Sequence, residues 1–157
     1  MKLVTLIFVF LLSSIANADI SGTALIVDGD TITISGNKIR LNGIDTPERD
    51  QTCKRAGITW RCGYEATETL RNWTYTKEVR CVGDTKDRYG RLIANCFVDG
   101  YNVNARLVYE GLALAYRKYS KQYVPEEDKA RAAKRGMWAG EFVAPWDWRK
   151  GKRLTSE

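Results

Sequence analysis

The chain has 157 residues, of which 44% are hydrophobic and 28% charged, a composition typical of one folded domain and not of a disordered or fibrous chain. Lys and Arg outnumber Asp and Glu by 25 to 19, so the formal charge is +6. The chain has no histidine, which excludes Ser-His-Asp catalysis, Cys-His catalysis and histidine-ligated metals. Any chemistry must rely on carboxylates, arginines, lysines, hydroxyls, thiols or a bound ion.

The first 18 residues have the pattern of a cleaved signal peptide. Lys2 supplies a positive charge, residues 3–12 are nearly all apolar, and Ala16-Asn17-Ala18 is an A-x-A cleavage site. A membrane anchor is the alternative, but the apolar run is shorter than the roughly 20 residues that cross a bilayer. We therefore expect export to the periplasm or the medium, with no stable membrane insertion after cleavage.

Four cysteines, Cys53, Cys62, Cys81 and Cys96, would then lie in an oxidising compartment, where an even number indicates two disulfides. Three pairings are possible. Local geometry favours Cys53–Cys62 with Cys81–Cys96, because a hairpin centred between residues 88 and 89 would place Cys81 opposite Cys96. A zinc site is the alternative, but the chain has neither a CxxC pair nor a histidine.

The pattern of the remaining chain predicts three strands, a helix, two strands and two helices. Residues 31–34 alternate apolar and polar side chains, and the turn signal Gly36-Asn37 joins them to a strand at 38–41. The other expected elements are a first strand at 21–27, an irregular loop at 50–62, a helix at 64–76, a hairpin of 79–82 with 92–98, a helix at 102–110 ended by Gly111, and a helix from Pro125 to about residue 135. This order fits an α+β fold, mainly β: a five-stranded antiparallel OB-fold barrel with helices beside it.

We expect one domain at residues 19–140 and a basic tail at 141–157 that carries Trp146 and Trp148. No repeat or linker divides the chain. The tail's function is not evident from its composition.

Three short segments carry the polar residues that could perform chemistry: Asp28-Gly29-Asp30-Thr31, Arg40 to Glu48 with its Asp45-Thr46-Pro47-Glu48 end, and Asp87-Arg88-Tyr89-Gly90-Arg91. Each alone reads as an ordinary turn or loop. Together, and with the stretch from Asp99-Gly100 to Ala113, they resemble the staphylococcal nuclease (thermonuclease) family over most of the chain after residue 18. That resemblance implies an OB-fold barrel with three helices and calcium-dependent hydrolysis of DNA and RNA to 3′-phosphate ends.

The resemblance also implies a calcium site. Asp30 and Asp45 match the two calcium carboxylates, and Thr46 matches the residue that offers a backbone carbonyl to the ion. Oxygen ligands without sulfur or imidazole suit calcium or magnesium and not zinc. Two carboxylates leave several positions to water, so we expect modest affinity.

The remaining matches concern the phosphodiester and the nucleotide. Glu48 matches the carboxylate that positions or deprotonates the attacking water, and Arg40 and Arg91 match the two phosphate-binding arginines. Guanidinium groups stay protonated and can meet the developing charge of the phosphate with paired donors. Tyr89 and Tyr116 match positions close to the bound nucleotide, and such rings favour single-stranded or breathing duplex DNA and RNA.

We expect a monomer that cleaves with little sequence preference. The main alternative is a non-catalytic OB-fold module that binds nucleic acid without hydrolysis. A calcium-dependent exported protein acting on another anionic target, such as a phospholipid, is a further alternative that rests only on the basic tail.

Overall fold

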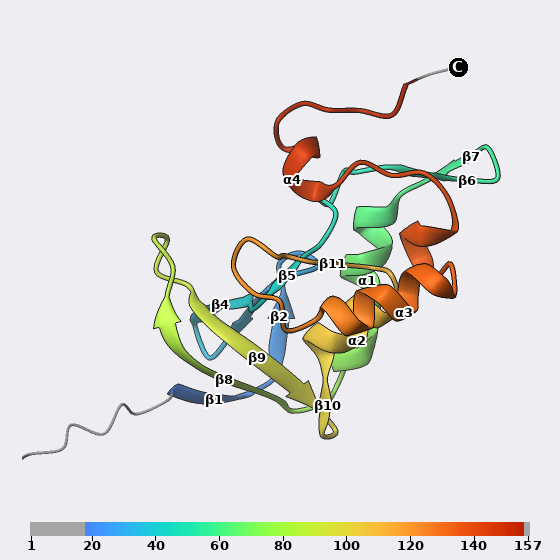
Figure 1. Ribbon diagram of the computed structural model, residues 1–157. Coiled ribbons are helices and arrows are strands. Elements are labelled where there is room, and N and C mark those ends of the chain that lie inside the picture. Colours follow the sequence, from blue (N-terminus) through green and yellow to red (C-terminus); the bar gives the residue numbers. More distant parts are fainter. Residues whose placement is uncertain (1–17, 156–157) are drawn as a thin grey trace, which may run out of the picture.

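The computed structural model describes residues 18–155, and its main feature is a curled sheet of seven strands (Figure 1). The strand order is β1-β8-β9-β4-β3-β2, with β10 added to β9. The sheet strands are β1 Ala18–Gly22, β2 Ala24–Ile26, β3 Thr31–Ile34, β4 Asn37–Leu41, β8 Val79–Lys86, β9 Leu92–Val98 and β10 Tyr101–Asn102. The predicted signal peptide lies, except for Ala18, outside the described residues.

The predicted first strand is divided into β1 and β2, because each half pairs with a different neighbour: β1 with β8, and β2 with β3. Counting the two halves together gives the five strands of the predicted barrel, to which β10 is an addition. The α+β fold, mainly β, is thus confirmed. One pair differs from the antiparallel expectation, since β4 and β9 are parallel. Residues 42–91 lie between these strands, and such a long connection permits parallel pairing.

Helices pack beside this sheet and close the core (Figure 1). They are α1 Cys62–Thr74, α2 Val103–Tyr109, α3 Val124–Ala132, the 3₁₀ helix η1 Gly136–Ala139 and the short α4 Pro145–Trp148. The structure therefore adds a fourth short helix, α4, to the three that the family resemblance implied. No helix within residues 18–155 is long and apolar enough to span a bilayer.

Gly111 ends α2 as predicted. Its φ is +69°, and its N–H and that of Leu112 donate to the carbonyls of Val108 and Leu107, the pattern of a Schellman cap. The chain then enters β11 Leu114–Ala115, which pairs with β5 Ile44–Asp45. This pairing fixes the backbone on which Asp45 lies.

The prediction of an irregular loop at residues 50–62 was wrong, because this segment holds a hairpin of β6 Cys53–Arg55 and β7 Ile58–Trp60. Its two strands pair with each other, and Lys54 also forms an isolated antiparallel bridge with Glu141. Apart from the buried Cys53, the strand residues are exposed or half-buried, so no alternation of apolar residues marks them in the sequence. The Cys53–Cys62 disulfide closes this segment as predicted.

The second disulfide, Cys81–Cys96, joins β8 and β9, and the two residues are direct partners in the register. The predicted hairpin and both predicted pairings are thus confirmed. A register shift between Val82 and Thr85 bends β8 before the tip of the hairpin, which carries residues 87–91.

Replacing Cys81 and Cys96 together by alanine is expected to lower the free energy of unfolding by about 2–3 kcal/mol. The bridge constrains a segment of 15 residues, and its loss gives the unfolded chain more freedom. Urea unfolding of the oxidised parent and of the double variant measures the difference. A loss well below 1 kcal/mol would contradict this expectation.

Candidate active site

The Asp28-Gly29-Asp30 turn leads into β3 and sets the position of Asp30. The Asp30 N–H donates to Asp28 Oδ1 over 3.0 Å, which tightens the turn. A Cβ at Gly29 would lie 2.7 Å from Thr46 Oγ1, so glycine lets the turn pack directly against Thr46. The turn and the segment of Thr46 are therefore held together by close backbone approach.

Asp30 is only 8% exposed, and its carboxylate receives several donors. Oδ2 accepts from both the N–H and the hydroxyl of Thr46, each over 3.0 Å. Oδ1 accepts from the Thr31 hydroxyl over 3.3 Å and forms an ion pair with Arg40 Nη1.

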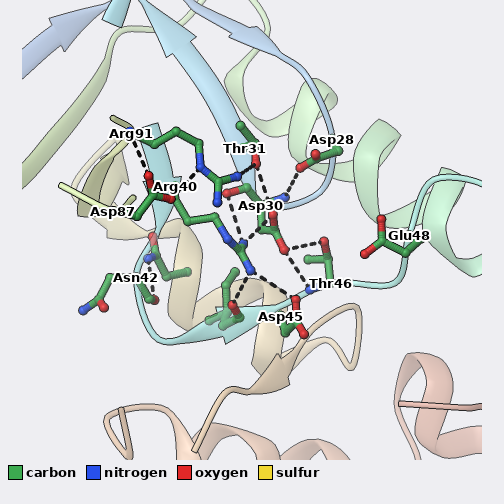
Figure 2. Close-up of polar contacts among 12 residues, drawn as sticks. Asp28, Asp30, Thr31, Arg40, Asn42, Asp45, Thr46, Glu48, Asp87 and Arg91 are labelled. Carbon is green, nitrogen blue, oxygen red and sulfur yellow. Dashed lines mark hydrogen bonds and ion pairs between the residues drawn. The ribbon is translucent and has the colours of Figure 1, made fainter. Parts of the chain in front are cut away.

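Arg40, on β4, joins the two predicted calcium carboxylates (Figure 2). Its Nη2 donates to Asp45 Oδ1 over 3.1 Å and to the Ile44 carbonyl over 3.3 Å, while Nη1 pairs with Asp30. Asp45 is fully buried. One guanidinium therefore spans both carboxylates, one from the turn before β3 and the other from β5.

Arg91 reaches the same group of residues from the β8–β9 hairpin (Figure 2). Its Nη1 donates to Thr31 Oγ1 over 3.2 Å, and its Nε donates to Asp87 Oδ2 over 2.7 Å. Asp87 also accepts from the N–H groups of Tyr89 and Arg91, which shapes the tip of the hairpin. The ring of Tyr89 is 68% exposed and lies 5.5 Å from the Arg91 guanidinium carbon.

Glu48 and Tyr116 stand apart from this direct network. Glu48 is linked to Asp45 by Arg149, whose Nη1 donates to Glu48 Oε1 over 2.7 Å and whose Nη2 donates to Asp45 Oδ2 over 2.6 Å. Tyr116 packs against Trp146 of α4 with nearly parallel rings, 5.5 Å between centroids.

Two residues that sequence reasoning missed hold the segment of Glu48. Gln51 is fully buried; its Oε1 accepts from the Glu48 N–H over 3.2 Å, and its Nε2 donates to the Val143 carbonyl over 2.6 Å. A Cβ at Gly63 would lie 1.6 Å from the Glu48 carbonyl oxygen, so only glycine fits at this second position of α1. The third missed residue is Arg149. The only signal for it was the basic character of the tail.

Burial and mutual repulsion govern the charges of the site. Burial, together with the negative charge of Asp30, raises the pKa of the Asp28 carboxyl to about 6. Burial also raises the pKa of Asp45, although the hydrogen bond from Arg149 opposes it. Burial alone would lower the pKa of Arg40, but the charges of Asp30 and Asp45 outweigh it and raise the pKa, so this guanidinium stays protonated.

The donors of the site fit a hard divalent cation. Asp30 and Asp45 provide carboxylate oxygens that already share one cationic partner, Arg40. Within residues 18–155 no cluster of three or more cysteine, histidine or acidic side chains could hold a metal. A cation here would therefore take two carboxylates from the chain and fill its shell with carbonyl oxygen and water, as calcium and magnesium do.

In the protein free of divalent ions, Asp28→Asn is expected to raise the free energy of unfolding at pH 7, on the order of 1 kcal/mol. The asparagine keeps the acceptor for the Asp30 N–H and removes a charge that the fold disfavours. The folded-state pKa of Asp28 lies above its ordinary value of 3.8, so ionising this carboxyl costs the folded protein free energy. This cost grows as the pH rises from 3.8 to about 6 and is fully present above about 6. Urea unfolding should show the stabilisation at pH 7 and almost none at pH 4. Equal differences at both pH values would contradict it.

The sequence of this chain is similar to those of several known proteins. Residues 38–140 match the family model described as staphylococcal nuclease homologue. The chain is 32% identical to the micrococcal nuclease of Shigella flexneri over 92% of its own length and 89% of that protein. It is 34% identical to an uncharacterized endonuclease of Haemophilus influenzae, over 83% of this chain and 72% of that one. It is also 36% identical to the succinoglycan biosynthesis protein ExoI of Rhizobium meliloti, of which it spans 64%. The chain thus belongs to the staphylococcal nuclease family, and it is a hydrolytic nuclease.

Proposed function

We propose that the chain is a calcium-dependent nuclease that hydrolyses phosphodiester bonds of DNA and RNA with little sequence preference and leaves 3′-phosphate ends. The nuclease domain would span residues 19–140, follow a signal peptide at 1–18 and act as a monomer. The two disulfides are typical of a periplasmic or extracellular protein and support export to one of these places.

One observation carries this proposal: Arg40 contacts both Asp30 and Asp45, and Arg91 reaches Thr31, directly beside Asp30. Two guanidinium groups therefore flank the same pair of carboxylates. Arg40 and Arg91 would therefore bring two positive charges to a phosphate at this site, beside carboxylates that could hold a cation, and such charges neutralise the charge added during phosphodiester hydrolysis.

Asp30, Asp45 and the Thr46 carbonyl would hold the calcium ion. When bound, the ion supplies positive charge that stabilises the charge developing on the phosphate oxygens. Arg40 binds the non-bridging oxygens from the β4 side. Its planar fork, already used here on two carboxylates, suits two phosphate oxygens equally well.

Glu48 would orient the attacking water and accept its proton late in the reaction. Its side chain is 39% exposed, so solvent can reach it. A carboxylate is a weak base and contributes mainly by orientation. Arg91 would stabilise the leaving oxygen by charge, because a guanidinium group holds its protons and is a poor proton donor.

Substrate preference follows from exposed aromatic groups. Tyr89 sits beside Arg88 and Arg91 at the hairpin tip and is exposed, so a base could reach its side chain. Tyr116 would contact a nucleotide farther along the strand. Stacking on such rings favours single strands or breathing duplexes and reads little sequence.

The test is product analysis with the purified chain. Single-stranded DNA and RNA are incubated with calcium and, separately, with EGTA. We expect cleavage only with calcium, and products that a polymerase cannot extend until a phosphatase removes the 3′-phosphate. Equal cleavage under both conditions, or 3′-hydroxyl ends, would overturn the proposal. Calcium-dependent binding without cleavage would favour the alternative of a non-catalytic binding module.

A further inference from the structure

A pocket of about 520 Å³ lies between the segment after β11 and the tail helix α4. We call it the tail pocket; it is lined by Ala115, Tyr116, Arg117, Lys118, Trp146, Arg149 and Lys150. The last three of these come from the tail, beyond the residues matched by the family model. Its volume falls within the range of about 300–1,000 Å³ usual for small-ligand sites and suits one nucleotide.

The aromatic wall of the tail pocket is held in place by packing. The rings of Tyr116 and Trp146 are stacked at an interplanar angle of 4°. Trp146 also packs against the second apolar cluster of the protein, which includes Leu114 and Met137. A ring fixed in this way offers a base a rigid stacking surface at little cost in side-chain entropy.

The other walls are cationic, and no acidic residue lines the pocket. Lys118 has no acidic partner among the described residues, and its ammonium lies 5.5 Å from the ring of Tyr119. Lys150 is 73% exposed and only loosely paired with Asp147, over 3.7 Å. Both ammonium groups are therefore available to phosphates.

Arg149 makes the tail pocket continuous with the candidate active site. The same side chain that lines the pocket donates to Asp45 and to Glu48. The tail pocket therefore lies directly beside Asp45 and Glu48 of the candidate active site.

We propose that the tail pocket binds a nucleotide of the single-stranded substrate next to the scissile phosphate, with the base stacked on Trp146 and a neighbouring phosphate on Lys118 and Lys150. This inference rests on the proposed function and extends it to residues of the tail. A single strand is favoured over a duplex because stacking on Trp146 requires an unpaired base.

Binding is measured in a Glu48→Gln parent with calcium, by fluorescence polarisation of labelled oligo(dT) of about ten nucleotides. We expect Trp146→Leu to weaken binding about 5- to 100-fold, the effect of losing one base–aromatic stack. We expect Lys150→Gln to reduce the slope of log Kd against log salt by about 0.7, which corresponds to one phosphate contact on a single strand.

The chain offers matched controls in the same tail. Trp148→Leu and Lys152→Gln make the same substitutions at residues that do not line the pocket, and both should retain the parent's affinity and salt slope. Inorganic polyphosphate, a strand of phosphates without bases, tests the stacking: Trp146→Leu should leave its binding unchanged. Thermal unfolding checks that Trp146→Leu is folded, and Lys150→Gln tests the pocket independently.

The inference is overturned if Trp146→Leu and Lys150→Gln bind oligo(dT) like the parent. It is also overturned if the control variants lose as much affinity for oligo(dT) as these two, or if Trp146→Leu weakens binding of polyphosphate as much as binding of oligo(dT). All of these outcomes are differences in binding between variants, and none of them depends on cleavage. Failure of the proposed function appears separately, as absence of calcium-dependent cleavage by the unsubstituted chain.

Discussion

Glu48→Gln is expected to lower kcat on single-stranded DNA about 10²–10⁴-fold, with a much smaller change in KM. The amide keeps the size of the side chain and an oxygen that can still accept from Arg149. It removes the group that would accept a proton from the attacking water. Initial rates in saturating calcium measure the effect.

Glu78→Gln provides the control, because Glu78 is an exposed glutamate just before β8. Its kcat should equal that of the parent. If Glu48→Gln retained kcat to within a few fold, Glu48 would not perform the proposed role, and another residue would have to orient the water.

Substitution of Arg40 is expected to damage both catalysis and stability. Arg40→Lys keeps a charge but loses the fork that spans Asp30 and Asp45, and kcat/KM should fall about 10²–10³-fold. Arg40→Met also leaves Asp30, which is nearly buried, without its cationic partner. The free energy of unfolding without calcium should then fall by about 3–5 kcal/mol.

Arg80→Met is the matched control, since Arg80 forms an exposed ion pair with Asp19 on β1 and should change neither quantity appreciably. Initial rates in saturating calcium measure kcat/KM, and urea unfolding in EGTA measures the free energy of unfolding. Unchanged stability of Arg40→Met would show that the two carboxylates do not depend on this guanidinium. Full activity of Arg40→Lys would show that the fork is not needed.

Local patterns predicted those parts of the fold that local interactions determine. Alternation at residues 31–34 gave β3, and the apolar runs around Cys81 and Cys96 gave the β8–β9 register. The turn between β3 and β4 was displaced by one residue: Ser35 and Gly36 are the central residues, both with positive φ, and Asn37 pairs with Ile34. The sequence marked the glycine correctly, but Ser35, and not Asn37, occupies the other left-handed position.

The candidate site was predictable to the extent that its residues occupy recognisable turns. The structure brings Asp30, Asp45, Thr46, Arg40 and Arg91 together, and their proposed roles await the experiments above. Arg149 and Gln51 were not predictable, because each acts through a partner about 100 positions away: Arg149 through Asp45 and Glu48, and Gln51 through Val143. No local periodicity reports such a contact.

The hydrogen bond between Gln51 and Val143 bears on how the protein can be shortened. A chain cut after residue 140, where the family model ends, would lack the carbonyl that Gln51 donates to. The buried amide would then lose a partner, at a cost of about 1–3 kcal/mol, while its other end still holds the backbone of Glu48. A fragment chosen by the family boundary alone would therefore be less stable than the 157-residue chain and would not represent its active site faithfully.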